Sequence, residues 1–102
     1  MKNLKSSQMK YLRGLAHSLK PTVIVGQKGF TEALVKSTEE ALDRHELIKV
    51  KFIDFKEKKV KNELVEAIAN STGSSKVGMI GHIALFYRQH VDPEKRKIVL
   101  PG

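Results

Sequence analysis

The sequence predicts an α/β domain in two layers, with three helices packed against a four-stranded mixed sheet. Two observations lead to this fold class. Segments with helical spacing of apolar residues alternate with short β-branched runs, and the last two runs are separated by only two residues. The order is therefore helix, strand, helix, strand, helix, strand, strand, with right-handed crossovers. The order of the strands within the sheet stays open.

The first helix is expected to begin after a cap at Ser6 or Ser7 and to run to about Leu19. Its apolar stripe, expected to face the core, contains Met9, Leu12, Ala16 and Leu19, with Leu15 alongside. Pro21 ends this helix, and the β-branched run at residues 22–25 is typical of a buried strand. Residues 26–29 then turn the chain.

A second helix is expected to follow Thr31, which is a good N-cap, with Phe30 packed on Val35. Its inward face contains Leu34, Val35, Thr38, Ala41 and Leu42. Residues 47–52 then alternate apolar side chains with Lys49 and Lys51, which predicts a strand whose two lysines point to the same side.

A third helix is expected from about residue 57 to residue 71, with Gly73 as its C-terminal stop. Two strands follow at residues 77–80 and 83–88, and Gly81 with His82 joins them in a tight hairpin. Residues 74 and 75 are expected to be loop.

The length of 102 residues is that of a single domain, with a core at about residues 4–90 and a polar tail at 91–102. The first few residues and the tail are expected to be mobile. The chain has no cysteine, no apolar run long enough to span a membrane and no secretory signal. These features favour a cytoplasmic protein without a membrane partner, and a monomer is favoured.

Charge points to a polyanionic partner. The formal net charge is +8, and no acidic residue precedes Glu32. Six basic residues lie in that first segment: Lys2, Lys5, Lys10, Arg13, Lys20 and Lys28. The following segment is acidic, so the electrostatic field is expected to be stronger on one side of the domain.

On the first predicted helix, four side chains fall within about 80° of one another at 100° per residue. They are Lys10, Arg13, His17 and Lys20. An ordinary solvated helix surface would also carry basic residues, but it would mix them with acids, and this helix has none. The pattern therefore favours a surface that contacts nucleic acid.

The loop Gly26-Gln27-Lys28-Gly29 joins a predicted strand to a helix N-terminus, where backbone amides and the helix dipole favour one phosphate. Two glycines let a nucleic-acid backbone approach closely, and Lys28 adds a positive charge. A plain turn is the alternative interpretation. The loop does not match the P-loop or dinucleotide motifs, so no nucleotide cofactor is expected.

Most of the sequence resembles that of a known family. The run "LRGLAHSLKPTVIVGQKGFTEALVKSTEEALDRHELIKVK", followed later by "GHIALFYR", resembles the CRM domain, the RNA-binding module of bacterial YhbY-type ribosome-assembly proteins and of plant organellar splicing factors. The resemblance covers nearly the whole chain. Phe86 stands where an aliphatic residue is more usual before Tyr-Arg, which is a conservative departure.

The resemblance implies a fold similar to the C-terminal domain of translation initiation factor three. It also implies RNA binding through the G-x-x-G loop and association with precursor large ribosomal subunits. By position, the loop residues are Gly26, Gln27, Lys28 and Gly29. To these, charge and geometry add five further candidate RNA-binding residues: Lys10, Arg13, His17, Lys20 and Arg88.

Other function classes find less support. The histidines at 17, 45, 82 and 90 are scattered without metal-ligand spacing, so no metal is expected. No nucleophile has a recognisable partner base, so an enzyme is not expected. Stacking of Tyr87 and Phe30 on bases stays open, although both are more easily explained as core residues. The alternative function is a protein-interaction module on the ribosome or an assembly factor, with the acidic second helix as its contact surface.

Overall fold

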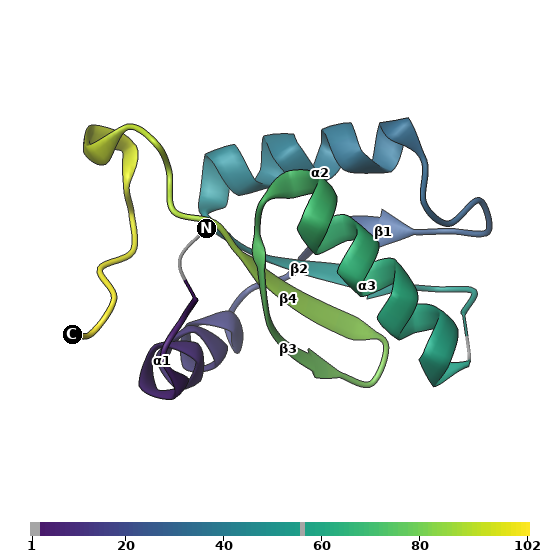
Figure 1. The fold of residues 1–102 in the computed structure, drawn as a ribbon, viewed down its shortest axis with the longest axis horizontal. Helices are drawn as coiled ribbons and strands as arrows, with labels where there is room; N and C mark the ends of the chain where they lie inside the picture. The colour runs from purple at the N-terminus through teal and green to yellow at the C-terminus, as the bar shows by residue number, and fades with distance from the viewer. Residues whose placement is uncertain (1–2, 56) are drawn as a thin grey trace.

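The computed structural model describes residues 3–55 and 57–102, so Lys2 of the basic N-terminal segment lies outside the described residues. The predicted α/β class, with three helices and a four-stranded mixed sheet, is confirmed (Figure 1). The elements are α1 (Ser6–Ala16), β1 (Pro21–Val25), α2 (Glu32–His45), β2 (Leu47–Phe52), α3 (Lys58–Thr72), β3 (Ser75–Ile80), β4 (Ile83–Tyr87) and a short 3-10 helix, η1 (Pro93–Lys95).

The sheet has the order β1-β2-β4-β3, in which β1 and β2 are parallel and the other neighbours are antiparallel. Helices α2 and α3 cover one face of this sheet. Helix α1 lies across part of the opposite face, which adds a partial third layer to the two that were predicted (Figure 1). The sheet therefore has one face covered by two helices and one face covered by a single short helix.

Side chains alternate between the two faces along each strand, as a pleated strand requires. On the α2 and α3 face, the strands contribute Val23, Val25, Ile48, Val50, Phe52, Ala84 and Phe86 to the core. On the α1 face, the buried strand residues are Leu47, Val77, Leu85 and Tyr87, which pack with Leu12 and Ala16 of α1. Two separate apolar clusters thus hold the two layers to the sheet.

Helix α1 is shorter than predicted. Its N-cap is Lys5, whose backbone amide donates to Gln8 Oε1 at 3.0 Å, so Ser6 is the first helical residue and not the cap. The helix ends at Ala16, because the chain then turns to bring Pro21 into register with Lys49 of β2. Leu15 and Leu19 are consequently 37% exposed each and do not belong to the buried stripe.

The other predicted helix ends agree with the structure to within one residue. The Leu34 amide donates to Thr31 Oγ1 at 3.1 Å, which is the expected N-cap of α2. Gly73 ends α3 in the left-handed conformation with φ of 63°. The hairpin strand β3 begins at Ser75, which was predicted as loop, because Ser75 pairs with Tyr87.

The C-terminal tail is held to the domain, contrary to the expectation of a mobile tail. The buried carboxylate of Glu46 accepts hydrogen bonds from the backbone amides of His90 (2.7 Å), Lys97 (2.6 Å) and Ile98 (3.1 Å). Ile98 and Leu100 then pack against the α1 cluster. The tail therefore forms part of the α1 layer. Among the described residues, no helix is long and apolar enough to cross a membrane.

Candidate nucleic-acid interface

Three connections meet at one end of the sheet, which we call the loop end: residues 26–31, 53–55 and 81–82. They meet there because β1 and β2 run in parallel and β4 begins opposite Lys51. Backbone hydrogen bonds join them, since Ile53 donates to the Val25 carbonyl at 3.1 Å and Phe52 donates to the His82 carbonyl at 2.8 Å. The loop end is thus a single bonded unit and not three independent loops.

Residues 26–29 form a tight turn, which we call the GQKG turn. The Gly29 amide donates to the Gly26 carbonyl at 3.0 Å, and Gly29 has φ of 63°, a conformation that glycine adopts without strain. A Cβ on Gly29 would lie 3.5 Å from the Phe55 ring and 3.8 Å from Leu64. The backbone conformation of the turn therefore accounts for glycine at position 29.

Gly26 differs from Gly29. Its φ lies outside the left-handed region, and a Cβ placed on it would have no neighbouring described atom within 4 Å. Packing and backbone conformation in the described structure therefore do not demand a glycine here. Because Gly26 has no side chain, the space above its backbone is open, next to the exposed side chains of Gln27 and Lys28.

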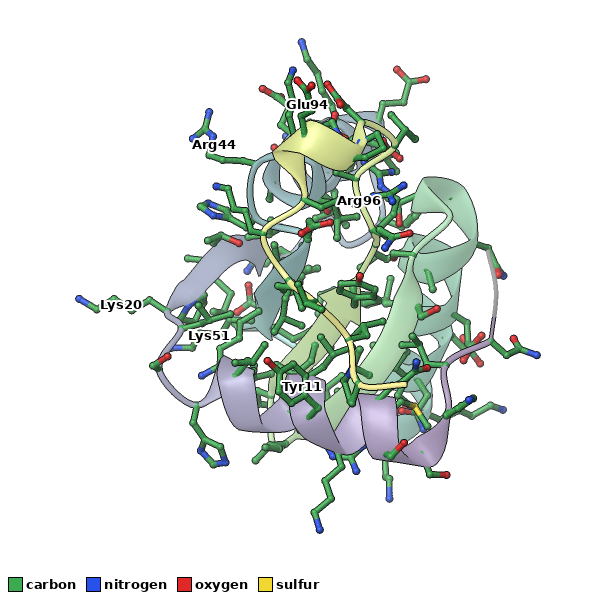
Figure 2. The ribbon with its side chains drawn as sticks, turned by 90° about the vertical axis from the view of Figure 1, so that its left-hand side faces the viewer. Tyr11, Lys20, Arg44, Lys51, Glu94 and Arg96 are labelled. Carbon is green, nitrogen blue, oxygen red and sulfur yellow. The ribbon has the colours of Figure 1, made fainter. Side chains whose placement is uncertain are left out.

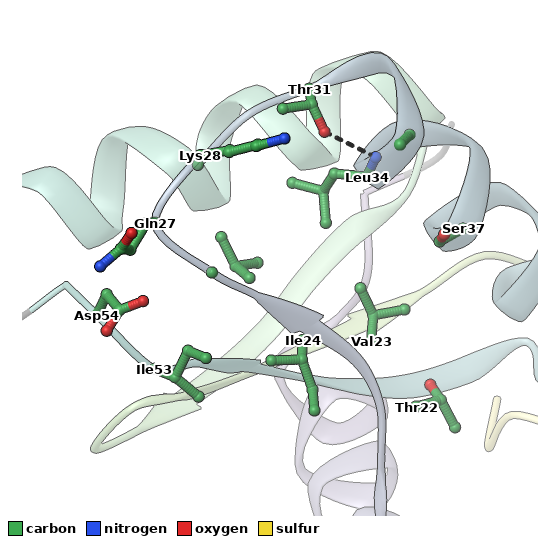
Figure 3. Close-up of a pocket in the computed structure, with 14 residues that line it drawn as sticks. Thr22, Val23, Ile24, Gln27, Lys28, Thr31, Leu34, Ser37, Ile53 and Asp54 are labelled. Atoms are coloured by element: carbon green, nitrogen blue, oxygen red, sulfur yellow. Dashed lines mark hydrogen bonds between the residues drawn. The ribbon is translucent and has the colours of Figure 1, made fainter.

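Figure 3 shows how the two side chains at the tip of the turn are arranged. The ammonium of Lys28 extends toward Thr31 and the first turn of α2, whereas Gln27 points to the other side of the turn, toward Asp54. Lys28 thus places a positive charge near the N-terminal end of α2, where the helix dipole also favours an anion. Two acidic residues also lie in this region: Glu32 in the first turn of α2, and Asp54, which lines the same groove as Lys28.

Below the turn, a shallow groove runs between β1 and the first turns of α2. Thr22 and Ile24 line it on the strand side, and Ala33 and Ser37 line it on the helix side. Since β1 is an edge strand, and the Val25 carbonyl faces β2, alternation directs the backbone N–H and C=O of Ile24 to the free edge. The groove therefore offers small side chains and backbone hydrogen-bonding groups.

The basic residues predicted on the first helix are not adjacent to the GQKG turn. Lys20 precedes β1 and Gly26 follows it, so the six steps of extended chain between them separate them by about 20 Å. Lys10 and His17 are exposed on the α1 side of the sheet. Arg13 is partly engaged in the fold, because its Nη1 donates to the Val77 carbonyl at 3.1 Å and its stem crosses Gly78.

Arg88 lies at the end of the sheet opposite the loop end. Its guanidinium pairs with Glu39 at 2.7 Å and with Asp43 at 2.8 Å, and it donates to the Thr72 carbonyl at 2.7 Å. The structure does not bring Arg88 to the GQKG turn, and we leave it out of the interface proposed below. The single positive charge of Arg88 is shared by two carboxylates of α2, which lowers by one unit the negative charge of the acidic surface that the protein-interaction alternative requires.

Lys49 and Lys51 of β2 were not assigned to the site from the sequence, although their alternation was recognised. Both project from the α1 face of the sheet, with Lys49 opposite Pro21 and Lys51 opposite Ile24. Figure 2 shows Lys20 and Lys51 extending from the same side of the molecule. These two lysines lie between the basic residues around α1 and the loop end.

Aromatic stacking finds partial support. Tyr87 is 1% exposed, so it cannot act as a stacking platform, while Phe30 is 42% exposed beside the GQKG turn. Burial raises the pKa of the Tyr87 phenol above its ordinary value, and the nearby Glu46 carboxylate raises it further, whereas Arg96 acts in the opposite direction. No described atom forms a hydrogen bond with the Tyr87 hydroxyl.

Two of the four histidines have hydrogen-bonding partners within the fold. His90 Nδ1 accepts a hydrogen bond from the Asp92 amide at 2.9 Å, and His82 Nδ1 lies 3.1 Å from the Nζ of the largely buried Lys61. Over residues 3–55 and 57–102, no three acidic or histidine side chains are grouped in a way that could hold a metal ion.

Comparisons with known proteins identify a family and several relatives. Residues 4–88 match the model of the CRS1 / YhbY (CRM) domain. The chain is 41% identical over 101 residues to a Haemophilus influenzae protein named "RNA-binding protein", covering 99% of this chain and 98% of that protein. It is 35% identical over 98 residues to the Bacillus subtilis "Probable RNA-binding protein YqeI", covering 96% and 99% of the two chains.

A solved structure is similar as well. The solution structure of SAV1595 from Staphylococcus aureus superimposes with a TM-score of 0.79 at 32% sequence identity, covering 97% of this chain and 100% of that one. The names of the two sequence relatives describe binding and not catalysis. This agrees with the prediction of a non-enzymatic domain.

Proposed function

The chain belongs to the CRS1/YhbY (CRM) domain family, and we propose that it is an RNA-binding protein that holds the sugar-phosphate backbone of folded RNA at the GQKG turn. The relatives described above are named for RNA binding, which supports RNA over other polyanions. The formal charge of +8 supports a polyanionic partner independently.

The observation that carries the proposal is the open space above Gly26. A residue with a side chain would fit the fold there, yet the turn leaves its backbone uncovered beside Lys28 and the start of α2. A phosphate that approaches this position meets the Lys28 ammonium and the positive end of the helix dipole. Thr31 caps the helix with its hydroxyl, which leaves other amides of the first turn to face a ligand.

We further propose that the RNA is ribosomal RNA of the precursor large subunit and that binding steadies an intermediate of ribosome assembly. This finer proposal follows from the resemblance to YhbY-type proteins. Crosslinking the protein to RNA in cell extract and sequencing the attached RNA tests it directly. Recovery of mainly messenger or transfer RNA would contradict it.

The backbone contact is tested by adding one negative charge at the turn. Gly29→Asp is unsuitable, because a residue with a side chain is strained at the φ of 63° that Gly29 adopts. Gly26→Asp points into open space. It should weaken binding of a structured RNA roughly tenfold to a hundredfold, as expected from the loss of one charge-assisted contact. The melting temperature should stay close to that of the parent.

A matched control is Val99→Asp, which adds the same charge in the exposed tail, on the side of the molecule away from the turn (Figure 1). It should retain most of the affinity. Lys28→Gln and Lys95→Gln form a second pair, of which only Lys28→Gln should lower the slope of log affinity against log salt by about one. If Gly26→Asp and Val99→Asp bound RNA equally well, the GQKG turn would not be the backbone contact.

A further inference from the structure

We propose that the uncovered half of the sheet on its α1 side binds unpaired nucleotides that continue from the RNA held at the GQKG turn. We call this surface the open sheet face and define it by Ile24, Lys49, Lys51, Ile80 and Ile83. The inference rests on the proposed function, because the unpaired nucleotides belong to the same RNA that the GQKG turn is proposed to bind.

The register of the sheet places these side chains in adjacent rows. Ile24 pairs with Lys51, Lys51 pairs with Ile83, and Ile83 pairs with Ile80, so one row crosses all four strands. The next row contains Lys49, which pairs with Leu85. Since neighbours in a row lie about 5 Å apart, the row forms a continuous strip of isoleucine and lysine side chains.

Most of this strip is exposed because α1 covers mainly the other half of the face; Ile83 is half-buried and packs against the α1 cluster. Helix α1 packs on Leu47, Val77 and Tyr87, toward the end of the sheet opposite the loop end. Ile24 and Ile80 are left 60% and 66% exposed. Between α1 and the strip lies a groove lined by Arg13, His17, Lys49, Ile80 and Ile83.

On α1 and on the strands of this face the charges have one sign, while Asp54 follows the end of β2 and lines the groove below the GQKG turn. Neither α1 nor the strand positions that face this side carry an Asp or Glu. Lys49 and Lys51 are two residues apart on one strand, about 6.6 Å along it, and Lys20 lies next to Pro21, the partner of Lys49. An apolar strip bordered in this way is complementary to a partner that combines negative charges with apolar surface.

Unpaired RNA has that combination. Its phosphates are negative, and its bases present apolar faces that a duplex hides by stacking. A duplex would engage the lysines but leave the isoleucines against ribose and water. The strip is also continuous with the proposed backbone contact, because Ile24 lines the groove directly below the GQKG turn. The strand edge thus gives a path from the turn to the sheet face.

The experiment compares two RNAs that share one hairpin, one of which carries an unpaired tail of roughly ten nucleotides, within the site sizes of single-strand-binding folds. Oligouridine and oligoadenosine tails are both used. The unpaired RNA tail should tighten binding to the parent protein about tenfold, which is the gain expected for a few base and phosphate contacts. Lys49→Gln/Lys51→Gln and Ile24→Ser/Ile80→Ser, the latter at two exposed positions, should each remove most of this gain while leaving hairpin affinity within about twofold.

The matched control is Lys58→Gln/Lys59→Gln on the exposed surface of α3, which should keep the gain from the tail. If the tail does not tighten binding to the parent, or if the β2 lysine variant weakens both RNAs equally, the open sheet face does not bind unpaired nucleotides. The proposed function has its own readout, since Gly26→Asp should weaken both RNAs through their shared hairpin and leave the gain from the RNA tail unchanged. An acidic peptide that competes with the tail but not with the hairpin would identify a protein partner instead and overturn the inference.

Discussion

The two faces of the sheet differ in cover and in charge. The face under α2 and α3 is closed, and its strand residues are buried apolar side chains. The face on the α1 side is closed at one end by α1 and the tail, and it is open and basic at the other end. The contrast separates two tasks that often compete: residues of the first face hold the fold, and residues of the open sheet face are free to bind.

The largest expected effect tests this division directly. Phe86→Ala, on the closed face, removes a fully buried ring and should lower the free energy of unfolding by about 3–5 kcal/mol. Ile24→Ala, on the open sheet face, should change it by no more than about 0.5 kcal/mol. Urea denaturation of the two variants measures both values. Similar losses for the two would show that the open sheet face is part of the core.

A second prediction concerns the C-terminal tail of the protein, which closes one end of the α1 face. In Glu46→Gln, one carboxylate oxygen is replaced by an NH₂ group that faces backbone amide donors from the tail. We expect a loss of about 2–3 kcal/mol, since these hydrogen bonds involve a buried charge. Hydrogen exchange of the Lys97 and Ile98 amides should become faster. Glu94→Gln, an exposed change in the same tail, should leave both measurements unchanged, and an equal response would rule out Glu46 as the specific anchor.

Most of the fold could be predicted because its signals are local. Thr31, Gly73 and the alternation of residues 47–52 each act through neighbours in sequence. The sequence predicted the end of α1 three residues too late, at about Leu19 and not at Ala16, and the reason is non-local. Leu15 and Leu19 continue the apolar spacing, but the pairing of Pro21 with Lys49 requires the chain to leave the helix earlier. The strand order depends on the same long-range pairings.

The candidate site was predictable only in part. The glycines of the GQKG turn form a local motif, whereas Arg88 finds its carboxylate partners 49 and 45 residues away, and no local pattern indicates that pairing. The shared direction of Lys49 and Lys51 follows from strand alternation. Their exposure follows from the short length of α1 and its place at one end of the sheet, which only the assembled fold reveals.

The smallest expected effect concerns Tyr87, which lies in the α1 cluster against which Ile98 and Leu100 of the C-terminal tail pack. Its hydroxyl is buried without a described hydrogen-bond partner, so Tyr87→Phe should stabilise the fold by about 1 kcal/mol. The raised pKa adds a dependence on pH. Above about pH 10 the unfolded phenol loses its proton while the folded one keeps it. The parent should therefore lose stability as pH rises from there through the folded pKa, by up to about 1.4 kcal/mol per unit.

Chemical denaturation between neutral pH and pH 11 measures this difference, and Tyr87→Phe should show a flatter decline. Tyr11→Phe is the matched control, because Tyr11 is 43% exposed and its loss should leave the parent profile unchanged. If the profiles of Tyr87→Phe and the parent run parallel, the phenol ionises as easily in the folded protein as in the unfolded chain. The α1 layer around Tyr87 would then admit water, and the boundary between the closed and open ends of this face would lie nearer to the tail.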